Sequence, residues 1–418
     1  MRTRRSRLAR FALVVVILLI LLGIAGSYLL QPQRASALLL DRVGKSLGLE
    51  ITASGQASYR LRGTPQLVLR DVVAHRPGDA TALLRADRVF VAVPWRTIRA
   101  RSRDLTVQRI ELDAPILDVP ALERWQATRP TGETRIPTLI DGLRINRGSI
   151  VNTDWVIDSI NVELPSLAPG KPLHAHLQGR YLAPPMTLPF DLVVAMTKPA
   201  NDAGVAATGK LTLQGKDWKM PTQVHLAGSL HVGAIDMHLS PAKFGLSARY
   251  VSAKSNLPFV LGAAGPLRFD KGVWALEPAA LILHGSGVIP DASANGALAF
   301  GRRLVLRLQG DIATWPDTWP ALPPPLSAST SPMAFTLDYM GQADFSDIAS
   351  LGLHRDATLF DAHFKLPAIL DWLDTGVSGS PLPPLAGRLQ TPRVEIAGAS
   401  LEGVDIEFQD DATTPVKP

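Results

Sequence analysis

Residues 48–72 read GLEITASGQASYRLRGTPQLVLRDV, and much of this stretch places an apolar residue at every second position. In a β-strand successive side chains point to opposite faces, so this alternation predicts a half-buried strand with one apolar face. That face belongs either to the core of an ordinary domain or to a surface with another purpose. The remainder of the chain bears on the choice.

The same period of two recurs along the chain. In Arg88–Pro94 (RVFVAVP) we expect Val89, Val91 and Val93 on one face, with Phe90 and Ala92 on the other. Further strands are predicted at residues 143–150, 158–164, 210–214, 223–232 and 303–309, and 393–408 predicts two strands about a Gly-Ala turn. Helical patterns are short and few, at residues 121–128 and 367–374.

The strand pattern predicts a mainly β protein. No strand alternates regularly with a helix of about 10–15 residues, which disfavours a doubly wound parallel sheet and favours an extended antiparallel one. At roughly a dozen residues per strand and turn, the body holds on the order of 25–30 strands. Open twisted sheets rarely exceed about ten strands without curling or splitting. We therefore expect either a curled, taco-like β-groove or stacked sandwiches, and a groove would expose an apolar concave face.

The N-terminal sequence predicts a membrane anchor. Phe11–Leu30 contains 20 residues without a charge, enough at about 1.5 Å per residue to span the hydrocarbon of a bilayer. Five arginines precede it, so the positive-inside rule places the tail in the cytoplasm and the body across the membrane. The predicted anchor residues are Phe11, Leu13, Val15, Ile17, Leu19, Leu21, Ile24 and Leu29.

A cleaved signal peptide is the alternative for this segment. Ala35-Ser36-Ala37 matches an A-x-A cleavage pattern. The apolar run is longer than the usual signal-peptide core of about 7–15 residues, which favours an uncleaved anchor.

The predicted organisation has seven parts. These are a basic cytoplasmic tail (1–10), the transmembrane anchor (11–30), a short helix (31–47), an N-terminal β-groove region (48–313), a Pro-rich loop (314–332), a C-terminal β region (333–409) and a polar tail (410–418).

Composition excludes several classes of function. Of 43 basic residues, five lie in the first ten positions, which leaves 38 against 37 acidic residues and no basic stripe for nucleic acid. The chain has no cysteine, so disulfides, thiolate zinc sites and a cysteine nucleophile are excluded.

The sequence also lacks a recognisable catalytic constellation. His174-x-His176 has no third metal ligand at a diagnostic spacing, and Asp361-Ala362-His363 has no nucleophile at a recognised spacing. His284-Gly-Ser-Gly lacks the glycine that a nucleophile elbow needs, and no Gly-rich phosphate loop with a lysine occurs. We therefore expect a non-enzymatic protein without a metal or cofactor.

Between the anchor and residue 119 the chain contains four strand motifs: a Gly-x-x-apolar strand, a P-x-L-x-L-x-(D/N)-V strand, an A-(D/E)-x-apolar strand and an I-x-L-x-x-P-x-apolar strand. The matching positions are Gly48 and Ile51; Pro65, Leu67, Leu69, Asp71 and Val72; Ala86, Asp87 and Val89; and Ile110, Leu112, Pro115 and Leu117. In these motifs the chain resembles the AsmA family of bacterial envelope proteins. Residues 139–155 and 385–408 look like further β segments of the family.

The resemblance implies a protein anchored in the bacterial inner membrane by a single span, with its body in the periplasm and a hydrophobic groove similar to that of bridge-like lipid-transfer proteins. It implies phospholipid as the partner and a role in outer-membrane lipid homeostasis. The residues expected to line the groove are Leu67, Leu69, Val89, Val91, Val93, Leu304, Leu306, Leu308, Val394 and Ile396. The alternative hypothesis is an assembly factor for outer-membrane proteins that binds an outer-membrane or periplasmic protein partner through an edge strand.

Overall fold

The computed structural model describes residues 40, 44–45, 48–100, 105–128, 136–232, 237–253, 255–270, 272–319, 321–375, 383–396 and 399–409. The predicted cytoplasmic tail, membrane anchor and polar tail lie outside these residues. So does most of the predicted helix at 31–47, of which Leu40, Gly44 and Lys45 are helical. Among the residues described, no helix has both the length and the apolar character needed to cross a membrane.

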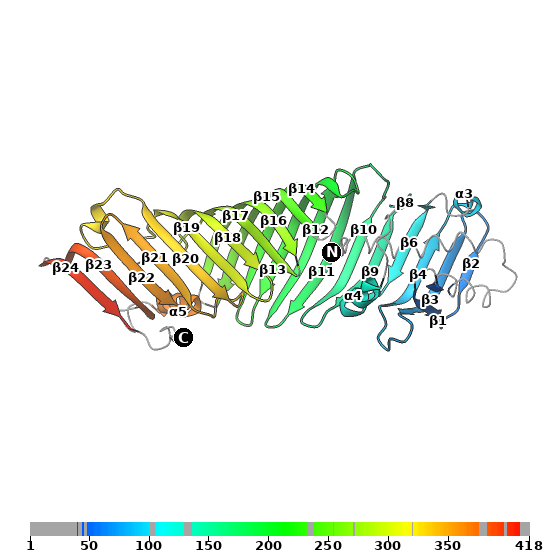
Figure 1. The fold of residues 1–418 in the computed structure, drawn as a ribbon, viewed down its shortest axis with the longest axis horizontal. Helices are drawn as coiled ribbons and strands as arrows, with labels where there is room; N and C mark the ends of the chain where they lie inside the picture. The colour runs from blue at the N-terminus through cyan, green and yellow to red at the C-terminus, as the bar shows by residue number, and fades with distance from the viewer. Residues whose placement is uncertain are drawn as a thin grey trace. The chain divides into compact units, whose positions relative to one another are not determined.

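The chain divides into two compact units, each built on a curled, mostly antiparallel sheet (Figure 1). Unit 1 contains residues 1–216 and 229–236, and unit 2 contains residues 217–228 and 237–418. The strand β14 (Trp218–Val232) contributes residues to both units. The division therefore falls in β14 and not at the predicted Pro-rich loop, because the strands on either side of that loop pair directly with each other.

Besides the helical residues 40, 44 and 45, the described part of unit 1 contains the short helices α3 (Trp95–Arg99), which was not predicted, and α4 (Val119–Ala127), which was. Its strands are β1 (Glu50–Ala53), β2 (Ser58–Arg60), β3 (Gln66–His75), β4 (Leu84–Ala92), β5 (Thr106–Val107), β6 (Arg109–Asp113), β7 (Ile116–Asp118), β8 (Thr138–Leu139), β9 (Leu143–Val151), β10 (Val156–Leu164), β11 (Leu173–Ala183), β12 (Met186–Met196) and β13 (Asp202–Gln214). From β9 to β13 each strand pairs antiparallel with the next, whereas β6 and β7 pair parallel with β9.

The opening stretch of the sequence forms β1, β2 and the first part of β3. Register in β3 and β4 sets Leu67 opposite Val91 and Leu69 opposite Val89, so these apolar residues share one face. The prediction that Val89, Val91 and Val93 point to the same side is confirmed, because all three lie in one core cluster and are 1–3% exposed.

That core of unit 1 is closed by segments outside the sheet. Helix α4 begins where the Asp118 side chain accepts a hydrogen bond from the Ala121 N–H at 2.7 Å, with Pro120 in the first turn. Trp125, one helical turn later, is 1% exposed and packs into the cluster with Val107 of β5 and Leu139 of β8. The apolar face of the first strands is therefore covered.

Unit 2 consists of consecutive antiparallel strands with one α-helix, α5 (Leu366–Thr375), and one 3-10 turn, η2 (Leu326–Ala328), among its described residues. Its strands after β14 are β15 (Met237–Ser252), β16 (Asn256–Asp270), β17 (Val273–His284), β18 (Asp291–Phe300), β19 (Leu304–Thr314), β20 (Met333–Gly341), β21 (Ala349–Arg355), β22 (Thr358–Phe364), β23 (Leu385–Ile396) and β24 (Ala399–Phe408). Pairing is antiparallel at every step from β15 to β24.

Glycines permit a close approach of neighbouring strands in unit 2. A Cβ placed on Gly296 of β18 would lie 1.9 Å from the Arg307 carbonyl oxygen, and one on Gly310 of β19 would lie 1.9 Å from that of Ser293. Side chains at these positions are sterically excluded, and glycines of this kind allow a sheet to coil.

Residues 315–332, which we call the strap, run along one edge of unit 2. The Trp319 indole N–H donates to the Val288 carbonyl in the turn after β17 at 3.0 Å, and the Ser331 hydroxyl donates to Asp356 in the turn after β21 at 2.5 Å. Farther along, the Glu395 N–H of β23 donates to the Pro324 carbonyl at 2.8 Å. The Pro-rich segment is therefore hydrogen bonded to two connections of the unit 2 sheet and to strand β23.

Candidate functional site: the apolar face of unit 2

One face of unit 2 carries three parallel cross-strand rows of apolar or small residues. Each row follows from the strand register, in which every second residue points to the same side. The first row contains Leu276, Leu298, Leu306, Tyr339, Ala349 and Phe364; the second contains Gly296, Leu308, Leu337, Leu351 and Ala362; the third contains Ala263, Leu281, Ala294, Gly310, Phe335, Leu353 and Phe360. None of the residues in these rows carries a charge.

The sheet itself and one turn provide the neighbours of these side chains. Two buried clusters form on this face, one around Ala263, Leu281 and Ala294 and the other around Leu306, Tyr339 and Ala349. All the hydrophobic residues packed against them come from the strands, except Phe345 in the turn after β20. Leu298, Leu308 and Leu337 are only half-buried. Within the described residues, no second layer like that of unit 1 packs on this face.

Three of the predicted groove residues lie on this face. Leu304 and Leu308 are half-buried and Leu306 is 8% exposed, all on β19. Across the strand, Leu306 lies opposite both Leu298 and Tyr339, and Leu308 lies opposite Leu337.

The other predicted lining residues lie elsewhere. Leu69, Val89, Val91 and Val93 are enclosed in the core of unit 1, and Leu67 packs against it, so they present little or no surface to a ligand in this structure. Val394 is 2% exposed on β23, beside the contact between Glu395 and the strap. Ile396 ends the same strand, at the far end from α5.

Sequence reasoning missed Leu281, Leu298, Phe335 and Leu337. The alternation that marks Leu281 is interrupted at Glu277-Pro278, where the register of β16, β17 and β18 shifts. Phe335 and Leu337 follow the long strap, but the period of two in β20 (MAFTLDYMG) is readable in the sequence and was available as a signal.

The opposite face of unit 2 carries the charged side chains of these strands, together with exposed apolar residues such as Ile282, Met340 and Leu359. Arg307 of β19 faces Asp338 of β20, and Arg388 of β23 forms a bidentate ion pair with Asp405 of β24. This pairing with Arg388 is the main cause that lowers the pKa of Asp405 below its ordinary value. These ion-paired side chains lie on the side of the sheet away from the three apolar rows, as in a sheet with one face in water.

A smaller apolar face occurs in unit 1 between β10 and β13. Val162, Leu177 and Leu192 are aligned across three strands, and Ala175 and Val194 form the next row. All of these side chains are half-buried. On the other side of these strands, Asp191 accepts hydrogen bonds from His176 at 2.6 Å and Gln178 at 3.0 Å, so this sheet has the same two-faced character.

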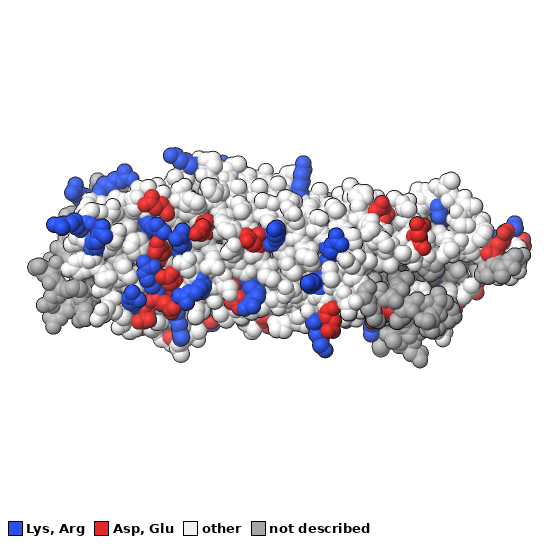
Figure 2. All heavy atoms as spheres, turned by 180° about the vertical axis from the view of Figure 1, so that it is seen from behind, with Lys and Arg blue, Asp and Glu red and all other residues white. Residues whose placement is uncertain are grey.

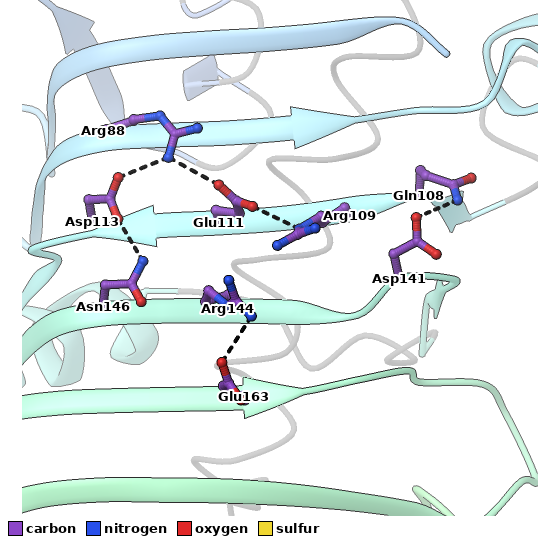
Figure 3. A network of polar contacts seen from close by, with 9 residues as sticks. All are labelled: Arg88, Gln108, Arg109, Glu111, Asp113, Asp141, Arg144, Asn146 and Glu163. Atoms are coloured by element: carbon purple, nitrogen blue, oxygen red, sulfur yellow. Dashed lines mark hydrogen bonds and ion pairs between the residues drawn. The ribbon is translucent and has the colours of Figure 1, made fainter. Parts of the chain in front are cut away.

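The outer face of the first strands of unit 1 carries a charged network, seen as mixed acidic and basic side chains in Figure 2 and in detail in Figure 3. Arg88 of β4 donates to Glu111 at 3.1 Å and to Asp113 at 2.9 Å, both on β6. The Asn146 amide of β9 donates to the other oxygen of Asp113 at 2.8 Å. The bond from Asn146 is the largest cause that lowers the pKa of Asp113. This network ties three strands together on the face opposite the core.

The described residues do not bring together the side chains of a recognisable catalytic site or metal site. No group of three His, Cys, Asp or Glu side chains is placed to hold a metal ion. Ser350 and His363 are within 3.0 Å on the face of unit 2 opposite the apolar rows, a contact that the sequence did not reveal. No carboxylate among the described residues hydrogen bonds to this His363 to complete a triad, so we assign no reaction to the pair.

Comparison with known proteins gives no match to this chain among family models, curated proteins or solved structures.

Proposed function

We propose that this protein binds lipid acyl chains on the apolar face of unit 2 and holds or moves phospholipid without catalysis. The observation that carries the proposal is the set of three uncharged rows on the strands from β17 to β22, in which some side chains are buried against each other and others, such as Leu298, Leu308 and Leu337, are only half-buried, with no covering layer among the described residues. A broad exposed apolar surface on a protein marks a site of interaction.

The dimensions and chemistry of the face suit an acyl chain. From β17 to β22 there are six strands, so at about 4.8 Å between neighbours the rows run for roughly 24 Å across the sheet. Each methylene removed from water contributes about 0.8 kcal/mol, so a chain lying along a row is strongly stabilised. Because the rows contain no charged group, the lipid headgroup would remain at an edge of the sheet.

The sequence supports phospholipid as the lipid class and the bacterial envelope as the location. The resemblance to the AsmA family over residues 11–119, and the apolar run at 11–30 after five arginines, both favour an inner-membrane anchor with a periplasmic body. In this proposal the apolar face of unit 2 is a passive binding surface, so any net direction of lipid movement comes from a gradient or a partner.

Lipid retention by face-specific variants tests the proposal. The full chain is purified in mild detergent, and bound phospholipid is quantified by native mass spectrometry and by extraction. The variant Leu308→Asp with Leu337→Asp places two carboxylates in the middle row, where they lie opposite each other. We expect it to lose most of the bound phospholipid, because desolvating a carboxylate beside an acyl chain is unfavourable.

The matched control uses the same two strands and the opposite face. Gln309 and Thr336 also lie opposite each other and are exposed, so Gln309→Asp with Thr336→Asp should retain phospholipid at the wild-type level. Circular dichroism and thermal melting identify any variant that fails to fold. Equal phospholipid in the folded row variant, the control and the wild type would refute binding on this face.

A further inference from the structure

Exposed apolar side chains lie along the edge of unit 2 that is opposite the strap. This edge carries the turns after β16, β18 and β20, and α5 connects β22 to β23 on the same side. At the tips of the first two hairpins, Val273 is 42% exposed, Trp274 is 40% exposed and Phe300 is 42% exposed. We call these three residues, with Arg302 and Arg303 in the turn after β18, the aromatic edge.

The aromatic edge is one contiguous surface. Trp274 lies directly opposite Phe300 across β17 and β18, and its ring centroid is 4.7 Å from that of Phe269 on β16. The two hairpin tips also touch, because a Cβ on Gly301 would lie 3.1 Å from Val273 Cγ2. The cluster is therefore shared by three strands.

The aromatic edge continues into the apolar face. Phe300 lies opposite Leu304 of β19, and the adjacent cross-strand pair, Leu298 and Leu306, belongs to the first apolar row. An acyl chain that leaves a bilayer at Trp274 and Phe300 would thus meet apolar side chains without crossing a polar barrier. At the strap edge, by contrast, the Pro-rich segment is hydrogen bonded to the turns after β17 and β21 and to β23.

The charges at the tips suit an anionic surface. Arg302 and Arg303 are both exposed and stand next to Phe300 in the turn, and Arg268 is exposed near the end of β16. Asp270 is the acidic residue described at these two hairpin tips, and Asp344 and Asp347 lie in the turn after β20 on the same edge. Aromatic rings prefer the interfacial region of a membrane, and each basic side chain near an anionic leaflet adds about 1 kcal/mol of attraction.

We propose that the aromatic edge docks on the surface of a bilayer that contains anionic phospholipid, with Val273, Trp274 and Phe300 entering the interface and Arg302 and Arg303 contacting headgroups. This extends the proposed function by identifying where lipid enters or leaves the apolar face. Docking is measured separately from lipid retention, so the two proposals can fail independently.

The absence of native cysteines allows a site-specific test. The full chain, held in a non-ionic amphipol, is labelled at Val273→Cys with an environment-sensitive fluorophore. The matched control is Ile282→Cys on the same strand, 54% exposed on the face opposite the apolar rows. Each is titrated with vesicles of phosphatidylcholine alone or of phosphatidylcholine with phosphatidylglycerol.

Docking predicts a blue shift of the label at residue 273, but not at 282, with the anionic vesicles. In the 273-labelled protein, Arg302→Gln with Arg303→Gln should raise the vesicle concentration at half-maximal shift by about tenfold or more. Equal responses at 273 and 282, or no change in the arginine variant, would overturn the proposal. So would a shift that depends on protein concentration without vesicles, because it would identify a second copy of the chain as the occupant.

Discussion

Trp125 and Leu308 illustrate at the residue scale what separates a core position from an open apolar surface. Both extend from amphipathic elements with apolar side chains on one side. Trp125 is 1% exposed because it packs on the sheet residues of unit 1 together with Val107 and Leu139. Leu308 is half-buried and its apolar neighbours come from the unit 2 strands. The two side chains differ in exposure because a second layer packs against the sheet at Trp125, whereas none of the described residues forms such a layer at Leu308.

The hydrogen bond between Asn146 and Asp113 gives a pH-dependent contribution to stability. Because the pKa of Asp113 is lowered in the folded protein, its carboxylate favours folding above the ordinary value of 3.8, and this contribution is lost as the pH falls through the lowered pKa. Asn146→Ala removes the largest cause of the shift. We expect the variant to be less stable than wild type near neutral pH, with the difference shrinking at acid pH.

Urea unfolding at a series of pH values between roughly 6 and 2 checks this prediction. The control is Asn152→Ala, since Asn152 lies in the turn after β9, away from the network. A destabilisation by Asn146→Ala that is constant across the pH range would contradict the linkage between this bond and the Asp113 pKa.

At the scale of elements, the strands could be predicted from the sequence, but the helix and short segments that pack on their apolar face could not. The predicted strands at 143–150 and 158–164 correspond to β9 and β10, and the two strands in 393–408 correspond to the end of β23 and to β24. The helices predicted at 121–128 and 367–374 correspond to α4 and α5, whereas most of the helix predicted at 31–47 lies outside the described residues. A period of two reports only that one face is apolar. The burial of Val89 and Val91 in one cluster with Trp125 of α4 depends on segments distant in sequence, so alternation could not distinguish those residues from Leu306 and Leu308.

Two glycines of unit 2 provide a prediction at this scale. Gly310→Ala should destabilise unit 2 by about 1–3 kcal/mol, because its Cβ would overlap the Ser293 carbonyl oxygen and displace β19 from β18. Gly245→Ala in β15 is the matched control, since a Cβ there has no atom within 4 Å. Thermal and urea unfolding measure both. Equal stability of the two variants would contradict a steric role for Gly310.

At the scale of the whole molecule, each unit pairs an apolar face with one that carries charged side chains. In unit 1 the first strands are closed by α4 and short segments, whereas the strands from β10 to β13 keep half-buried apolar rows. In unit 2 the apolar rows run from β17 to β22. The sequence predicted an apolar concave face, but it placed half of the lining residues in what is the closed core of unit 1. The covering helix and short segments, not the alternation pattern, distinguish the two regions.

The central claim is that acyl chains contact the apolar rows of unit 2, and photo-crosslinking tests it most directly. The full chain is reconstituted with a phospholipid that carries a diazirine in its acyl chain, irradiated and digested, and the adducts are mapped by mass spectrometry. We predict adducts on inward residues of β17 to β22, such as Leu298, Leu308 and Leu337, and their loss in Leu308→Asp with Leu337→Asp. Adducts confined to residues 11–30, or equally frequent on the opposite face at Gln309 and Thr336, would contradict the claim.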